Sequence, residues 1–427
     1  MTPHCFISRS RVRHLLRLST LLSFVIPPAL ASELEPMLFG ALQDIQASRI
    51  RAAERQVDEL LRHYPNFRLG HLIKGDLLLA HARPLSVMGD GVRSAGPRID
   101  ELRAEALQRA KRASEPPPPG ALPWEVWQLS ANERHLLVVD TSSSRLFVFE
   151  NLAGKLERVA DYYVSIGRLG AGKTREGDQK TPVGIYHTAG SISPARLTDF
   201  YGSGAFPLNY PNEWDRRQAR SGHGIWLHGT PRDTYSRPPF ASDGCVVLAN
   251  RELEDLASRL DGASVPVIIA PKIDWVLPEQ SASRAAGFHR ALESWRVDWE
   301  SRDTERYLRH YASEFQTQGK DLAAWREHKL NVNALKTFIR VGITNLSVFQ
   351  YPGNQDLAVV TFDQEYQSDR LANQMRKEQY WRQVDGVWQI IYEGPAAAPR
   401  TAVAMSQGSI IKVAAKSSRK SPKIRRS

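Results

Sequence analysis

Cysteine is almost absent from this chain, which has 427 residues and only Cys5 and Cys245. The sequence therefore excludes the dense disulfide framework of small secreted domains. Cys5 lies in an N-terminal segment that we expect to be removed, so Cys245 has no partner for a disulfide. A lone thiol is a liability in an oxidising compartment unless it does chemistry or is deeply buried. Cys245 is therefore the first residue to explain.

Long apolar runs are also missing. The run Leu18 to Ile26 is shorter than the roughly 20 residues that span a bilayer. No acid precedes Glu33, and Ala29 to Ala31 fits a small-x-small cleavage site. Four arginines come before or at the start of the run: Arg9, Arg11, Arg13 and Arg17. Residues 1–31 are predicted to be a secretory signal peptide or, alternatively, an uncleaved anchor, and the rest to be exported to the periplasm or cell envelope.

The body of the chain has no excess of positive charge. The formal net charge is +11, of which four charges belong to the predicted signal and seven to the last sixteen residues. The neutral body does not favour a nucleic-acid-binding fold. Residues 396–427 are predicted to be a disordered basic tail. This tail either contacts an anionic wall or membrane surface or only keeps the protein soluble.

The first part of the mature chain has helical periodicity. Apolar residues recur at helical spacing from Leu34 to Ile45, and further helices are expected before Tyr64 and from Leu69 to Ala82. Residues 32–115 are predicted to form a small all-α domain for packing or for homodimerisation. Residues 116–122 form a proline-rich linker.

Strand patterns dominate residues 123–271, which we expect to be a mainly-β domain. One helix interrupts them, from Arg251 to Leu260, with Asn250 as the expected N-cap. The expected strands are Leu136 to Asp140, Arg145 to Glu150, Val159 to Ile166, Val183 to Tyr186, Ile225 to His228 and Val265 to Ile269.

A linker over 272–283 is expected to lead to a third unit, residues 284–395. Helical spacing of apolar residues extends from Ala285 to Phe315, and another helix precedes Phe338. Four strands follow, the last two joined by a hairpin turn at Asp385 and Gly386. The expected strands are Ile339 to Phe349, Leu357 to Ser368, Met375 to Val384 and Trp388 to Glu393. Helices followed by an antiparallel sheet predict an α+β cone, whose aromatic side chains either pack its core or line a glycan site.

Cys245 and His228 are interpreted as a nucleophile and its base. A thiol attacks acyl carbons as a thiolate, so a base must take its proton. Alternation in the strand before Gly229 places His228 opposite Leu227, and the Gly229 carbonyl can hold the second imidazole nitrogen. Cys245 follows a turn at Ser242, Asp243 and Gly244, where backbone N–H groups of Gly244 and Cys245 can face an oxyanion.

These blocks resemble the L,D-transpeptidase catalytic domain family. The resemblance rests on His-Gly, then Ser-x-Gly-Cys followed by apolar residues, and on upstream blocks at 164–167 and 176–186. It implies that Cys245 is the acylated nucleophile, His228 the general base and acid, and Gly229 the orienting member. The implied substrates are peptidoglycan stem peptides, with a thioester formed at diaminopimelate and D-alanine released. No cofactor is implied.

Two positions depart from that family. Asp243 stands where many members have histidine, and Val247 stands where many have arginine or asparagine. Asp243 either meets the amine of diaminopimelate or caps the turn. The other candidate substrate contacts are Trp226, His223, Lys173, Arg175, Arg232 and Arg168.

The three-part layout is similar to the cell-shape L,D-carboxypeptidases with an NTF2-like C-terminal domain. In that interpretation water is the acceptor of the acyl group, whereas the wider family resemblance leaves both water and an amine of a neighbouring stem open. A rival from another class is a catalytically inactive scaffold that binds the wall.

Two other sites are excluded. Residues 167–174 fit the phosphate-loop pattern, but the glycines and proline that follow, at 177, 182 and 184, give no helix to hold phosphates. His223 and His228 lie five positions apart around a strand and face opposite sides, so we expect no metal site.

Overall fold

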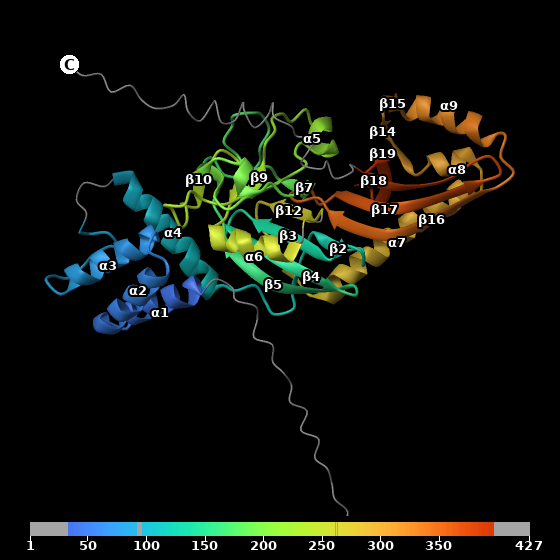
Figure 1. Cartoon of the computed structure of the whole chain (residues 1–427). Helices are drawn as coiled ribbons and strands as arrows, with labels where there is room; N and C mark the ends of the chain where they lie inside the picture. Colours follow the sequence, from blue (N-terminus) through green and yellow to red (C-terminus); the bar gives the residue numbers. More distant parts are fainter. Residues whose placement is uncertain (1–32, 92–95, 261, 263, 397–427) are drawn as a thin grey trace, which may run out of the picture.

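The structure is a computed structural model that describes residues 33–91, 96–260, 262 and 264–396. The predicted signal peptide and the basic tail, apart from Ala396, lie outside these residues. The described chain has three parts in a row: helices at one end, several short and long strands in the middle, and a long sheet with its helices at the other end (Figure 1).

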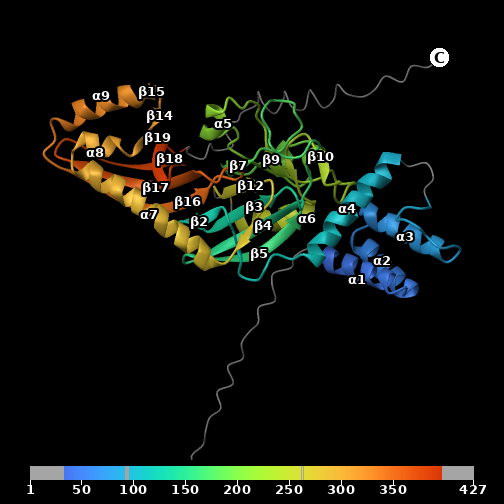
Figure 2. The same ribbon diagram turned by 180° about the vertical axis from the view of Figure 1, so that it is seen from behind.

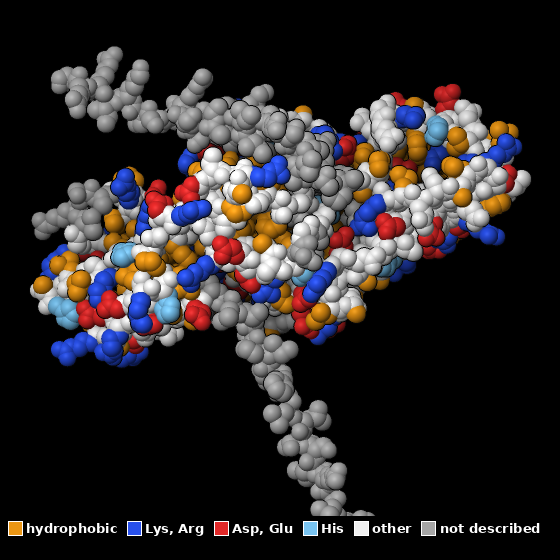
Figure 3. Space-filling model, in the orientation of Figure 1, with side chains coloured by type: hydrophobic (Ala, Val, Ile, Leu, Met, Phe, Trp, Pro, Cys, Tyr) orange, Lys and Arg blue, Asp and Glu red, His pale blue; other side chains and the backbone are white. Residues whose placement is uncertain are grey.

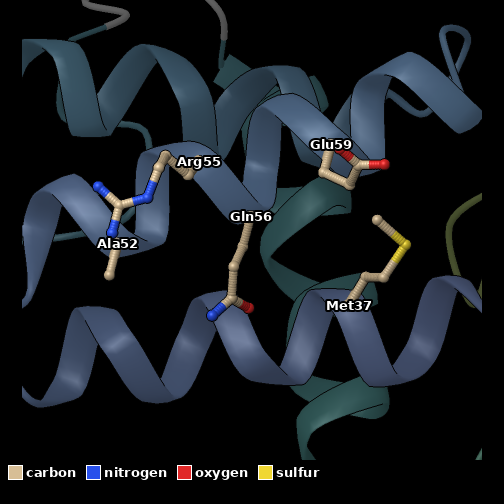
Figure 4. A pocket seen from close by; sticks show the side chains of 5 residues that line it. All are labelled: Met37, Ala52, Arg55, Gln56 and Glu59. Atoms are coloured by element: carbon tan, nitrogen blue, oxygen red, sulfur yellow. The ribbon is translucent and has the colours of Figure 1, made fainter.

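The N-terminal part is helical, as predicted. Its helices are α1 (Leu34–Gln46), α2 (Ile50–His63), α3 (Arg68–Ala80) and α4 (Gly96–Ser114). Their apolar faces form one core that includes Leu38, Val57, Phe67 and Ile73. A partly open hollow of about 310 Å³ lies between α1 and α2, lined by Met37, Ala52, Arg55, Gln56 and Glu59 (Figure 4).

The middle part is mainly β and surrounds one apolar core. Its short and long strands are β1 (Leu122–Pro123), β2 (Val126–Gln128), β3 (His135–Asp140), β4 (Arg145–Leu152), β5 (Lys155–Tyr163), β6 (Ile166–Gly167), β7 (Gly184–His187), β8 (Ala205–Pro207), β9 (Trp226–His228), β10 (Phe240–Ser242), β11 (Val246–Val247), β12 (Pro266–Ala270) and β13 (Trp275–Val276). Its helices are η1 (Pro194–Arg196), η2 (Asp199–Tyr201), α5 (Glu213–Arg217) and α6 (Asn250–Leu260).

A five-stranded sheet in the order β5-β4-β3-β12-β7 is the frame of this part. Strand β12 pairs parallel to β3 and antiparallel to β7. A second sheet, in the order β11-β9-β8, carries the predicted nucleophile and base. The core between them includes Leu137, Val148, Leu227, Val246 and Leu256.

Helix α6 confirms the expected helix but corrects its cap. Asn250 is the first residue of α6 rather than a residue that caps it. Its side-chain amide instead bonds the backbone of Ser203 and Thr230. The amide is used to join two loops, so it is not free to accept the N–H groups at the helix start.

The C-terminal part is an α+β fold, as predicted. It contains α7 (Pro278–Glu300), α8 (Thr304–Leu308), β14 (Tyr311–Thr317), β15 (Lys320–Asp321), α9 (Leu322–Asn333), β16 (Ile339–Gln350), β17 (Leu357–Ser368), β18 (Ala372–Val384) and β19 (Val387–Pro395). The helix expected from Ala285 to Phe315 ends early, because Tyr311 to Phe315 belong to β14, which pairs with β19. Asp385 and Gly386 both have positive φ, as the predicted hairpin turn requires.

The middle and C-terminal parts share a sheet and a core. Strand β2 pairs with β16 and extends the C-terminal sheet to seven strands. One apolar cluster joins Phe147 and Ile268 of the middle part to Phe349 and Leu357 of the C-terminal part. Helix α7 runs along this junction (Figure 2). The segment 272–283, expected to be a linker, contains β13 and the start of α7.

The surface has no single concentrated basic face in the view of Figure 3, where lysine and arginine side chains are spread over all three parts. Among the described residues, no helix has the length and apolar character needed to cross a membrane.

Candidate active site

Strands β9 and β11 place His228 and Cys245 on one face of the small sheet. The strands are parallel, with Val246 opposite Leu227 and Val247 opposite His228. Leu227 and Val246 both point into the main core. Because side chains alternate along a strand, His228 and Cys245 both point to the other face.

His228 is held in one tautomer. Its Nδ1 lies 2.7 Å from the carbonyl oxygen of Gly229. A carbonyl only accepts, so Nδ1 carries the proton and Nε2 keeps its lone pair. Burial, with the positive charge of Arg237, lowers the pKa of His228 to about 3. At neutral pH the ring is an uncharged base, with Nε2 available.

Cys245 is half-buried and its thiol is protonated at neutral pH. Burial raises the pKa of Cys245 to about 11, although the backbone of Trp226 and the charge of Arg237 favour the thiolate. The sulfur lies 3.4 Å from the carbonyl oxygen of Gly224, to which the thiol donates. The resting pair is therefore a neutral thiol beside a neutral imidazole, so attack requires proton transfer to His228.

The turn before Cys245 is fixed by hydroxyl groups. Ser242 Oγ donates to the Cys245 carbonyl at 2.6 Å and accepts from the Gly244 N–H at 3.1 Å. Thr181 Oγ1 donates to the Gly244 carbonyl at 3.0 Å. The expectation that the Gly244 N–H faces an oxyanion is thus corrected, because Ser242 already accepts from it. The expectation remains for the N–H of Cys245.

Aromatic rings form the wall around the pair. Tyr201 lies 5.1 Å from the His228 ring and 5.0 Å from the Trp226 ring, between centroids. Tyr201 and Cys245 pack together against the cluster that contains Trp226. Trp226, predicted as a substrate contact, is buried, so its ring forms the base of this wall.

The loop after β6 contains two of the predicted substrate contacts. Lys173 is buried, and its Nζ donates to Asp178 at 2.8 Å and to the Arg175 carbonyl at 3.0 Å. Burial alone raises the pKa of Asp178, but the bonds from Lys173 and from the backbone lower it to about 2. Lys173 therefore holds the loop together, whereas Arg175 is exposed.

The remaining predicted contacts lie at the rim. Arg168 pairs with Asp243 at 2.7 Å, so each neutralises the other. Arg232 lies 3.6 Å from Asp199, and its side chain is 89% exposed. His223 is exposed and lies 4.0 Å from Glu176. The structure thus brings Asp243 and Arg168 together and leaves His223 and Arg232 on the surface.

The segment with the phosphate-loop pattern forms no helix. No helix begins between Gly167 and Gly184, so the phosphate-loop pattern lacks its helix. The described residues contain no group of His, Cys, Asp or Glu arranged to hold a metal ion.

One residue near Cys245 and His228 is not predicted by the sequence analysis. Arg237 lies in the loop between β9 and β10, and its charge acts on both Cys245 and His228. No motif marks it, because it precedes Cys245 by eight residues in an irregular loop. The only sequence signal for Arg237 is that it is an arginine close to the Cys245 turn.

The fold and this site define the class of protein. Residues 134–269 match the L,D-transpeptidase catalytic domain, and residues 287–394 match the Cds6 C-terminal NTF2-like domain. The chain therefore contains a catalytic domain of the L,D-transpeptidase family joined to an NTF2-like domain of the Cds6 type.

Two solved structures are similar over most of their own length. Bd1075 of Bdellovibrio bacteriovorus has 29% identity and a TM-score of 0.58, over 65% of this chain and 99% of that one. The helical cell shape determining protein Pgp2 from Campylobacter jejuni has 25% identity and a TM-score of 0.55, over 63% of this chain and 94% of that one. Comparison with curated proteins finds no match.

Proposed function

We propose that this protein is a peptidoglycan-modifying cysteine acyl-transfer enzyme of the cell envelope. In this proposal, Cys245 forms a thioester at the diaminopimelate of a tetrapeptide stem and D-alanine is released. The observation that carries the proposal is the common face of Cys245 and His228, with the Nδ1 of His228 held by Gly229.

Acylation starts from the neutral pair. The Nε2 of His228 takes the thiol proton as the sulfur of Cys245 attacks the carbonyl carbon of diaminopimelate. The C–N bond to D-alanine then breaks, and the leaving amine takes the proton from Nε2. Proton transfer in the attack avoids a free thiolate, which the buried site disfavours.

Deacylation reverses these roles with a new nucleophile. An amine of a neighbouring stem gives a proton to Nε2 and attacks the thioester, and Cys245 leaves as a thiol. Transfer to an amine is our primary proposal, and it is supported by the exposed ring of Phe200 beside His228, which offers an apolar contact for a second peptide. Water as the acceptor gives an L,D-carboxypeptidase, which trims the tetrapeptide to a tripeptide.

A role in cell shape is supported by the similarity to Pgp2. The C-terminal domain is proposed to position the enzyme on the wall without chemistry of its own. The rival from another class is a wall-binding scaffold with an inactive catalytic domain.

Purified full-length protein incubated with disaccharide tetrapeptides tests these proposals. Release of D-alanine, followed by mass spectrometry, is expected from the native protein and not from Cys245→Ala with an unchanged circular dichroism spectrum. Cross-linked or exchanged products with an added amine indicate a transpeptidase, and tripeptide alone indicates a carboxypeptidase. Equal release from both proteins would reject Cys245 as the nucleophile, and no release from either would favour the scaffold.

A further inference from the structure

Arg237 lies at the edge of the site and reaches it through Phe200. Its guanidinium carbon is 4.6 Å from the centre of the Phe200 ring, and its Nη2 lies 3.4 Å from the Phe200 carbonyl oxygen. The Phe200 ring lies 5.8 Å from the ring of His228. The Phe200 ring therefore lies beside both the guanidinium of Arg237 and the ring of the predicted base, His228.

Arg237 lacks an acidic partner within the part of the chain that the structure describes. The other two arginines of the rim each have one, since Arg168 pairs with Asp243 and Arg232 with Asp199. Arg237 is half-buried, and burial lowers its pKa, although the charges of Cys245 and Asp243 oppose this. A partly desolvated cation without a paired anion is costly unless an anionic ligand meets it there.

The N-terminal helices hold the two residues that precede Arg237. The ring of Tyr235 lies 5.1 Å from Tyr64 and 5.6 Å from Phe67, both edge-on. Ser236 Oγ donates to the buried carboxylate of Glu105, on α4, at 2.7 Å. The helical part thus contacts the loop that leads to the active site.

Two further hydrogen bonds fix the same loop. Asn66 Nδ2 donates to the Arg232 carbonyl at 3.1 Å. The hydroxyl of Tyr163, on β5, donates to the Arg237 carbonyl at 3.0 Å. The loop that carries Arg237 is therefore anchored to both the helical part and the large sheet, which limits the region that its side chain can reach.

We propose that Arg237 binds the terminal carboxylate of the stem peptide, and that the N-terminal helices position it through Tyr235 and Ser236. The proposal rests on the proposed function for the identity of the substrate. The position two residues after Cys245, where many family members carry arginine or asparagine, is occupied here by Val247, which is buried. Arg237 supplies the missing cation from another loop, and a guanidinium suits a carboxylate because it donates two parallel hydrogen bonds.

Two alkylating agents test the anion site without the stem substrate. Iodoacetate carries a carboxylate and iodoacetamide is neutral, so the ratio of their rates at Cys245 reports recognition of the anion independently of the thiolate fraction. Mass spectrometry of the Cys245 peptide gives each rate. We expect Arg237→Ala to lower the iodoacetate-to-iodoacetamide ratio about fivefold. Arg237→Lys is expected to keep most of the ratio, and Arg134→Ala, which removes an exposed arginine elsewhere, to keep it in full.

Two stem substrates test the same residue in catalysis. We expect the native protein to prefer a free terminal carboxylate over a terminal carboxamide by about 10- to 100-fold in kcat/KM. Arg237→Ala should lose this preference. Equal kcat/KM values of the native protein for the two stems would overturn the proposal. An alkylation ratio in Arg237→Ala equal to that of the native protein would also overturn it. If the native protein consumes neither stem but Arg237→Ala still lowers the alkylation ratio, the proposed function is rejected and the anion site is supported.

Variants of Tyr235 test whether the N-terminal helices position Arg237. Tyr235→Ala should lower the alkylation ratio, because it removes the ring that packs edge-on against Tyr64 and Phe67, and Tyr235→Phe, which keeps the ring, should lower it less. Circular dichroism confirms that each variant is folded. A ratio in folded Tyr235→Ala equal to that of the native protein would reject the role of the N-terminal helices.

Discussion

The side-chain amide of Asn250 bonds both backbone polar groups of Thr230, two residues after the predicted base. Its Oδ1 accepts from the Thr230 N–H at 3.1 Å, and its Nδ2 donates to the Thr230 carbonyl at 2.8 Å. The same Oδ1 accepts from the Ser203 N–H at 3.0 Å. Asn250 therefore fixes the backbone that carries the Gly229 carbonyl, and through it the ring of His228.

Asn250→Ala is expected to lower kcat more than it raises KM, because the Gly229 carbonyl loses its support while the substrate contacts remain. Three backbone groups lose a partner, so the free energy of unfolding should fall by about 1–3 kcal/mol. Asn250→Asp keeps the acceptor and should lose less. Stem-peptide kinetics and urea unfolding measure both effects. Glu254→Gln, on the exposed face of α6, is the control, and a similar kcat loss in it would argue against this role.

Gly244→Ala should be strongly destabilising. Gly244 has a φ of 126°, and an added Cβ would lie 2.7 Å from the carbonyl oxygen of Lys180, a backbone atom that cannot move away easily. Gly177→Ala separates strain from collision, because Gly177 also has positive φ, 77°, but nothing lies near its Cβ. We expect about 1 kcal/mol for Gly177→Ala and clearly more for Gly244→Ala in urea unfolding. Equal losses would mean that the close approach to Lys180 is relaxed at no cost.

The rate of alkylation of Cys245 should keep rising with pH above the pH at which the rate for an ordinary thiol levels off. Because burial raises the pKa of Cys245 to about 11, the thiolate fraction in the folded protein grows about tenfold per pH unit between pH 8 and 10. The same peptide in urea should level off near its ordinary pKa. Iodoacetamide rates followed by mass spectrometry measure both curves. A plateau near pH 9 in the folded protein would contradict a neutral resting thiol.

Mild acid should destabilise the protein partly through His228. Burial lowers its pKa in the folded state to about 3, so between pH 6.5 and 3 the unfolded chain binds a proton that the folded chain does not. The stabilisation present above pH 6.5 is therefore lost as pH falls, by up to about 2 kcal/mol at pH 5. His228→Gln should lose less stability between pH 7 and 5 than the native protein. Parallel losses in the two proteins would show that His228 titrates normally.

The middle and C-terminal parts should unfold together. Phe349, on β16, is buried in the cluster that also contains Phe147 of β4, so it stabilises both parts. Phe349→Ala is expected to lower stability by about 3–5 kcal/mol in a single transition. Tryptophan fluorescence and loss of D-alanine release should follow the same melting curve. Val387→Ala, at an exposed position of the same sheet, is the control. Two separate transitions would reject the shared core.

Local patterns in the sequence predict much of this fold, because each depends on neighbours along the chain. The alternation at Trp226 to His228 predicts the strand and the face of the base, and Asp385 with Gly386 predicts the last hairpin. Tyr311 to Phe315 continue a helical spacing, but pairing with β19 makes them a strand. Tertiary contacts decide such cases, and the pattern does not contain them.

The candidate site follows the same division. The positions of Cys245, His228 and Gly229 could be predicted because a spaced motif carries them. The partners that support them could not, because Asn250 and Arg237 act through loops that meet only in the folded chain. Lys173 is predicted from the sequence as a substrate contact but is buried against Asp178, since an ion pair formed inside a loop leaves no periodic pattern in the sequence.

The pairings of β2 and β3 determine when this protein can complete its sheets during its synthesis. Strand β3 finds its parallel partner β12 about 130 residues later, and β2 finds β16 about 220 residues later. When the Cys245 turn has been synthesised, the strands that complete both sheets have not yet been made. The five-stranded sheet can therefore be completed only after β12 is made, and the seven-stranded sheet only after β19, which ends at Pro395.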